Sequence, residues 1–171
     1  MALFDAFLKI DGIKGESADD KHKGEIDIMS FSWGASQTGV SATGGGGGAG
    51  KVHVHDFVIT KKTDQSSPLL FLNCANGAHI KEANFVVRKA GGTQLEYLKI
   101  KLTDILISSF KPHGSGADTQ HAGTVGDEIP SEEVSFNFSK VEFSYQPQGA
   151  DGKAQGGPIL AGWDIKANKK V

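Results

Sequence analysis

Four extended segments of the sequence share one irregularity, which limits the folds that the chain can adopt. Each alternates apolar and polar residues, as a strand with one buried face does, and then changes the parity of its apolar positions once. In one of them Leu98, Ile100 and Leu102 share one face. The next apolar residues, Ile105 and Ile107, share the other. The same change occurs in the segments 25–33, 51–61 and 132–145.

Two structures explain such a change of parity. A β-bulge inserts one residue and re-aims the rest of the strand, as happens at the corners of barrels. Alternatively, the strand is regular, and its second half buries its outer face against another element or another copy of the chain. Because four segments change parity together, we expect a small, strongly coiled β-barrel with part of its outside covered.

The composition supports a mainly β fold in a single domain over residues 1–171. The chain is long enough for one full hydrophobic core, and its 23 glycines and 5 prolines indicate many turns. Long glycine-rich loops are predicted at 34–50 and 111–129.

One helix is predicted, in the segment SSPLLFLNCANG at 66–77. A serine can cap its N-terminus, and Pro68 loses no hydrogen bond at the first helical position. Asn76 and Gly77 can end the helix in the left-handed conformation.

A glycine-rich stretch raises the question of nucleotide binding. Residues 45–52 read GGGGAGKV, and the first seven fit the P-loop spacing G-x-x-x-x-G-K. A working P-loop opens a helix and has Ser or Thr after the lysine. Here Val52 follows Lys51, and the next residues, VHVHDFVIT, are typical of a strand. We therefore expect a connecting loop, with no nucleotide and no other cofactor.

Other reactive side chains form no convincing site. His53 and His55 share one face of a predicted strand, but a zinc site needs a third and usually a fourth ligand. Cys74 is predicted to be helical, and the end of that helix separates it from His79. No G-x-S-x-G nucleophile elbow occurs. We expect no metal site and no catalytic residue, so the chain is not expected to be an enzyme.

The charge pattern indicates which partners the chain can bind, and the N-terminal segment indicates how it could leave the cell. The formal net charge is −2, and pairs such as Lys61-Lys62 and Glu132-Glu133 are expected to be solvated. We expect no nucleic-acid partner and, without an apolar run of about 20 residues, no membrane insertion. The N-terminal segment MALFDAFLKIDGIKGES lacks the regions of a secretory signal peptide. We expect synthesis in the cytoplasm and export, if any, by a route that accepts folded protein.

Six stretches, in order along nearly the whole chain, carry a further signal. They are FLKIDGIKGES near the start, HKGEIDIMSFSWG at 22–34, DFVITKKTDQSSPLLFLNCANGAHIKEANFVVRKAGG at 56–92, EYLKIKLTDILISSF at 96–110, EEVSFNFSKVEFSYQPQ at 132–148 and GWDIKANKK near the end. Together they resemble the haemolysin-coregulated protein family, the tube protein of the bacterial type VI secretion system. The departures lie in loops, notably 44–48 and 111–127.

The resemblance implies a small antiparallel β-barrel of two sheets with one short α-helix. Some members of the family carry an added C-terminal toxin domain, but this chain ends soon after the matching stretches, so we expect no added C-terminal effector domain. The resemblance also implies that six copies form a ring and that rings stack into a hollow tube. A contractile sheath expels this tube together with a spike protein, and effectors travel in its lumen. The family is secreted without a cleaved signal peptide.

The tube hypothesis assigns interface residues. The long loop is expected to reach a neighbouring copy and to become ordered on assembly. The apolar residues around the parity changes are expected to supply lateral contacts. The candidates are Gly39, Ser41, Thr43, Gly44, Gly48, Lys51, Phe31, Trp33 and Phe57. Two alternatives stay open: a monomeric β-barrel that binds a small apolar ligand inside it, and an enzyme that uses Lys51 or the His53/His55 pair.

Overall fold

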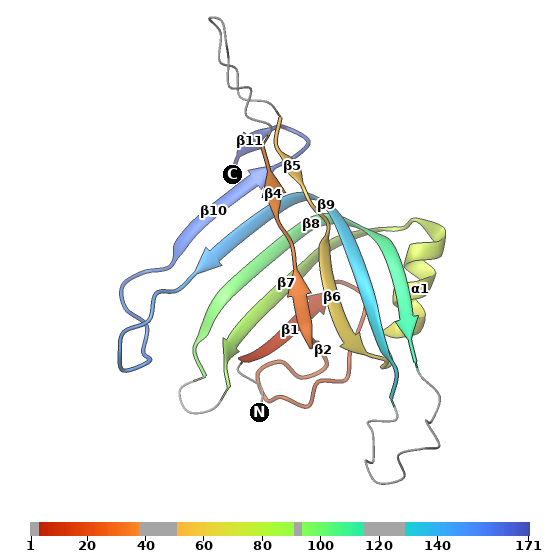
Figure 1. The fold of residues 1–171 in the computed structure, drawn as a ribbon, viewed down its shortest axis with the longest axis horizontal. Coiled ribbons are helices and arrows are strands. Elements are labelled where there is room, and N and C mark those ends of the chain that lie inside the picture. Colours follow the sequence, from red (N-terminus) through yellow and green to blue (C-terminus); the bar gives the residue numbers. More distant parts are fainter. Residues whose placement is uncertain (1–3, 38–50, 91–93, 115–128) are drawn as a thin grey trace, which may run out of the picture.

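The computed structural model describes residues 4–37, 51–90, 94–114 and 129–171. Within them the chain is mainly β with one short helix, which confirms the predicted fold class (Figure 1). The elements in chain order are β1 (Phe4–Ile10), β2 (Ile26–Asp27), β3 (Ser30–Ser32), β4 (Ala35–Ser36), β5 (His53–Val54), β6 (Phe57–Lys62), α1 (Ser67–Asn76), β7 (His79–Lys89), β8 (Glu96–His113), β9 (Ser131–Tyr145), β10 (Ile159–Asp164) and β11 (Lys169–Lys170).

The described strands form one antiparallel nine-stranded sheet and a short β4–β5 pair. The main path runs β11-β10-β9-β8-β7-β1-β2, while β6 pairs with β9 and β3 pairs with β6. The long strand β9 therefore has two partners on one side. β6 pairs with its first half, up to Phe136, and β10 pairs with its second half, from Lys140 to Tyr145.

The predicted barrel is not closed by a continuous ladder. The main path ends at β2 on one side, and the branch through β6 ends at β3; these two strands are consecutive in the chain and pair with β1 and β6 respectively. Between them the Ile28 N–H donates to the Ala6 carbonyl (2.9 Å) and the Met29 N–H donates to the Thr60 carbonyl (2.8 Å). The chain itself thus connects the two ends of the sheet.

The parity changes are bends around a single core. Leu102 and Ile105 are both buried, as are Phe138 and Val141 on β9, so both halves of each strand face the same interior. No register shift accompanies the change, because Leu102 pairs with Val141 and Ile105 with Phe138. The bend is made at Asp104, whose φ is +54°. In the segments 25–33 and 51–61 the strand stops and restarts instead.

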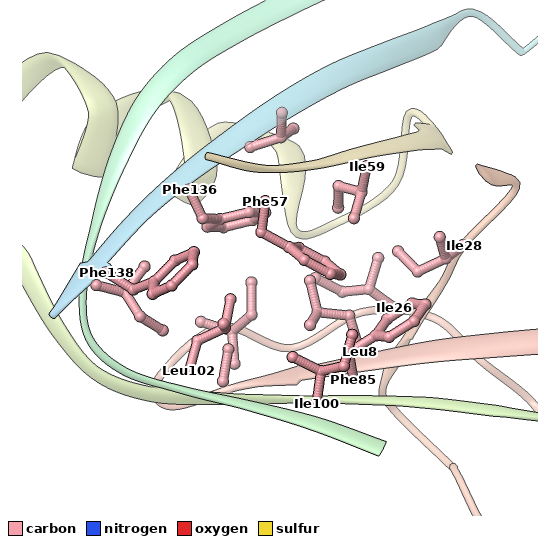
Figure 2. Close-up of a cluster of buried hydrophobic side chains, with 14 of the residues drawn as sticks. Leu8, Ile26, Ile28, Phe57, Ile59, Phe85, Ile100, Leu102, Phe136 and Phe138 are labelled. Atoms are coloured by element: carbon pink, nitrogen blue, oxygen red, sulfur yellow. The ribbon is translucent and has the colours of Figure 1, made fainter. Parts of the chain in front are cut away.

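This finding corrects one expectation from the sequence. Phe57, which follows the parity change in the segment 51–61, does not form spare apolar surface on the outside. Phe57 is fully buried, and its ring lies 5.1 Å from that of Phe85 (Figure 2). Its side chain fills the interior of a single chain and is absent from the surface that a neighbour could contact.

Helix α1 ends as predicted but begins differently. Gly77 has a φ of +63° and ends the helix in the left-handed conformation. Ser66 has helical dihedral angles and makes no side-chain cap. The Ser67 hydroxyl instead accepts from the Asp64 N–H (3.0 Å), so the first turn is tied to the loop before it.

A buried ion pair joins this first turn to the sheet. Lys61 is fully buried, and its ammonium donates to Glu132 (2.7 Å), Asp64 (2.8 Å) and Ser67 (3.2 Å). Ser67 also donates to Glu132, which is 1% exposed. The expectation that Lys61 and Glu132 are solvated is therefore wrong. Lys61 faces the interior side of β6, opposite Glu132 on β9.

A second charged cluster holds the loop between β1 and β2. Arg88 is 3% exposed and donates to Asp19 (3.0 Å), whose pKa it lowers through that hydrogen bond. His22 is also buried, with one ring nitrogen 2.8 Å from Glu25 and the other 3.0 Å from Glu96. These contacts fix a loop that has little regular secondary structure.

Replacing Lys61 by methionine is expected to lower the free energy of unfolding by about 3–5 kcal/mol, because Glu132 then keeps a buried charge without its cation. The double variant Lys61→Met/Glu132→Leu should recover most of this loss. Denaturant unfolding at one protein concentration measures both. A loss below about 1 kcal/mol in Lys61→Met would contradict the role of the pair.

Candidate assembly surface

The inner face of the large sheet is covered over only part of its width. One cross-strand row runs through Phe85, Ile100, Phe143 and Ala161 on β7, β8, β9 and β10. Opposite residues in such a row point to the same face. Phe85 and Ile100 are buried, Phe143 is half-buried and Ala161 is exposed. The face that forms the core on β7 and β8 therefore reaches solvent on β10.

A neighbouring row shows the same increase in side-chain exposure toward β10. Leu98, Tyr145 and Ile159 form one row, in which Tyr145 is 42% and Ile159 is 64% exposed. The cause lies in the pairing of β9, since β6 leaves it at Phe136. We call this area the open sheet face; it consists of Phe143, Tyr145, Ile159, Ala161 and Trp163.

The β4–β5 pair stands beside this area and forms the second wall of an apolar groove. The groove has a volume of about 620 Å³, and its lining includes Trp33, Val52, Val54, Phe143 and Trp163 but no charged side chain. The rings of Trp33 and Phe143 lie 5.9 Å apart. The indole N–H of Trp163 is buried and has no hydrogen-bond partner among the described residues.

A second apolar patch lies on α1. Leu69, Phe71 and Leu72 are 41%, 58% and 51% exposed, whereas Leu70 is buried. We call the three exposed residues the helix patch. Figure 1 places α1 on the right of the molecule and β10 on the left.

An ionic cluster anchors the segment that follows β10. Asp104, at the bend of β8, accepts hydrogen bonds from Lys166 (2.5 Å), Ser139 (2.6 Å) and His79 (2.8 Å). Lys166 is the main reason that the pKa of Asp104 lies far below its usual value of 3.8, and Ser139 and His79 add to the effect. The cluster holds the chain after β10 against β8 and β9, which keeps the open sheet face in place.

The structure places four of the predicted interface residues. Trp33 lines the groove, and Lys51 is exposed just before β5. Phe31 is half-buried and packs on Phe85 (4.6 Å between rings), next to the buried Phe57. The other five lie outside the described residues: Gly39, Ser41, Thr43, Gly44 and Gly48.

Sequence reasoning missed the most exposed residues of this region. The segment 159–163 reads ILAGW and is apolar at both parities, which is unusual for a strand at the edge of a sheet. That pattern was the available signal for Ile159 and Leu160, which are 64% and 70% exposed.

The structure also shows where the other motifs considered in the sequence lie. Lys51 leads into the strands β5 and β6, so the P-loop-like stretch does not open a helix. The exposed His53 and His55 rings lie 5.1 Å apart, and no cluster of three or more potential metal ligands occurs in the described ranges. Cys74 is half-buried in α1. Among the described residues, no helix combines the length and apolar character needed to span a membrane.

Comparisons with known proteins identify relatives along almost the whole chain. The family model for "Type VI secretion system effector, Hcp" matches residues 7–145. Protein hcp1 of Pseudomonas aeruginosa is 47% identical over 165 residues, which cover 96% of each chain. The crystal structure of Hcp1 from Salmonella typhimurium is 40% identical, with a TM-score of 0.80 over 99% of this chain and 100% of that one. A type VI secretion system effector from Yersinia pestis is 35% identical, with a TM-score of 0.72 over 94% and 100%.

The substitution Asp104→Asn should destabilise the chain by about 1 kcal/mol at pH 7, a modest value because the partly exposed site is screened by solvent. A carboxylate with a lowered pKa stabilises the folded state above its unfolded value of 3.8, and this contribution is lost as the pH falls below that value. The difference between the two proteins should therefore shrink from pH 7 to pH 3 in denaturant unfolding. An unchanged difference would rule out the charged cluster as its cause. Asp151→Asn, in an exposed loop, is the matched control.

Proposed function

Because this chain belongs to the Hcp family of type VI secretion proteins, we propose that it is a structural tube subunit of that system. In this proposal six copies form a ring, and rings stack into a hollow tube that is expelled from the cell with effectors in its lumen. Its partners are further copies of itself, the spike protein and the contractile sheath. The number six rests on the family resemblance. The chain acts by assembly and not as an enzyme.

The open sheet face is the observation that carries this proposal. It is the continuation of the chain's own core surface, and the groove beside it lacks charged side chains. Monomeric proteins rarely leave a continuous apolar area of this kind in water, because covering it is favourable. A contact between two different surfaces of identical subunits also repeats from copy to copy, and it closes into a ring when the rotation allows.

The groove also favours a second candidate, a monomeric protein that binds a small apolar ligand. Its volume and lining suit such a ligand. The interior expected for a ligand-carrying barrel is, however, filled by Phe57, Phe85 and Phe136 (Figure 2). The two candidates differ in one measurable property, since the ligand carrier is a monomer and the tube subunit is not.

We expect export without a cleaved signal peptide after synthesis in the cytoplasm. The compact core and the buried ion pairs suit a route that transports the folded protein. Mass spectrometry of the secreted chain tests this, and an N-terminus shortened by about 15–30 residues would contradict it.

The substitution Ile159→Asp is expected to convert rings into monomers, because it places a charge in the apolar contact. Light scattering after size-exclusion chromatography and negative-stain electron microscopy measure the result. Leu160→Asp is the matched control, since Leu160 lies on the same strand and is similarly exposed but points to the opposite face. It should leave the ring intact. A wild-type chain that stays monomeric at high concentration would refute the proposal.

Deleting residues 44–50 tests the proposed role of the long loop in stacking. Rings should persist, because the open sheet face is unchanged, but tubes should become shorter or disappear in electron micrographs. Ordering a glycine-rich segment on assembly costs conformational entropy, so we expect stacking to be weaker than ring formation. Tubes of unchanged length would remove the loop from the stacking contact.

A further inference from the structure

The short β4–β5 pair has two chemically different faces. Val54 lines the apolar groove, and the residues on either side of it, His53 and His55, share the other face because side chains alternate along a strand. The His55 N–H donates to the Gly34 carbonyl (2.8 Å), so the extended pairing continues past β5. Ser36 is the pairing partner of His53 and lies on the same face. The outer face of the pair therefore presents two imidazoles and one hydroxyl, all exposed to solvent.

The separation of the two histidine rings suits a shared metal ion. The ring centres of His53 and His55 lie 5.1 Å apart, and the ring planes meet at 81°. Zinc lies about 2.0–2.1 Å from an imidazole nitrogen, and the centre of the ring lies about 1 Å beyond that nitrogen. Two rings on one tetrahedral ion therefore have their centres about 5 Å apart. The observed spacing is that of two ligands of one ion.

Ser36 indicates which nitrogen of His55 is free to bind the ion. The Nε2 atom of His55 lies 3.3 Å from the Ser36 hydroxyl oxygen. When the Nε2–H group donates to this oxygen, a neutral imidazole has its lone pair on Nδ1. Metal-binding histidines commonly use their second ring nitrogen in this way, which fixes both the tautomer and the orientation of the ring. Ser36 is thus a positioning residue, and Nδ1 of His55 is the ligand atom.

Asp56, the nearest acidic residue in the sequence, is engaged elsewhere. Its carboxylate accepts hydrogen bonds from Ser108 (2.5 Å) and Asn137 (3.1 Å). It also follows His55 directly in an extended segment, so its side chain points the other way. Within the described part of the chain, the two histidines are therefore the protein ligands, and water takes the remaining positions around the ion. Such a site is open, and its ion can exchange with solvent.

We propose that His53 and His55 bind one Zn²⁺ ion on the outer face of the β4–β5 pair. Imidazole nitrogen is among the preferred ligands of zinc. The sequence predicted no metal site because it offered too few ligands, whereas this proposal rests on the ring spacing and on the Ser36 contact. A two-stranded pair is only marginally stable alone, so the ion stabilises one wall of the groove. The site lies within one chain and does not depend on the proposed tube function.

Calorimetric titration of the untagged, metal-free chain with Zn²⁺ tests this proposal. One ion per chain is expected. His53→Ala and His55→Ala should each weaken binding about tenfold or more, since even the outer partners of a metal site contribute about that much. The matched control His113→Ala removes an exposed histidine outside the pair and should leave the affinity unchanged, as should Cys74→Ser. No binding of Zn²⁺, or binding that survives the loss of His53 and His55, would overturn the proposal.

Two variants of Ser36 and the position of the ion test the geometry. Ser36→Ala should weaken Zn²⁺ binding, and Ser36→Thr, which keeps a hydroxyl, should restore it. Anomalous X-ray scattering from zinc-soaked crystals should place the ion beside Nδ1 of His55 and a ring nitrogen of His53. An ion on Nε2 of His55 would overturn the role of Ser36, and an ion elsewhere would overturn the site. Ring formation, seen by electron microscopy, is a separate readout that bears only on the tube function.

Discussion

β9 is divided between two partners, and this division explains why the subunit has both a closed core and an uncovered apolar surface. The half that pairs with β6 lies over the filled interior, where Val134 and Phe136 are buried. The half that pairs with β10 continues the same face after the covering strand has ended, so Phe143 and Tyr145 are progressively more exposed. Shortening β9 would remove the open sheet face, and lengthening β6 would cover it.

Three ionic clusters stabilise the structure where regular hydrogen bonding stops. Lys61 and Glu132 join the start of α1 to the sheet, Arg88 and Asp19 hold the loop after β1, and Asp104 holds the segment after β10. Each cluster restricts a connection that would otherwise be free to move. A surface that is already rigid loses little conformational entropy when it binds, so these clusters favour the proposed assembly.

Much of the fold could be predicted from local patterns. Alternation identified the strands, and the proline and glycine signals identified the helix that ends at Gly77. The parity changes correctly indicated strong bending, but they could not show which element covers each face, because that depends on contacts between distant residues. Phe57 therefore looked like a candidate for the surface and proved to be core. Lys61 and Glu132 were expected to be solvated for the same reason, since the two residues pair with each other across 71 positions of the sequence.

The energetics explain why the proposed ring needs several modest contacts. Covering one side chain such as Ile159 contributes about 1–2 kcal/mol, whereas association costs at least about 4 kcal/mol in lost freedom of motion. One exposed residue is therefore insufficient, and a row such as Leu98, Tyr145 and Ile159, together with the groove, is required. In a closed ring each subunit is held on both sides, so releasing one subunit breaks two contacts at once. The proposed ring can thus be stable although each contact is moderate.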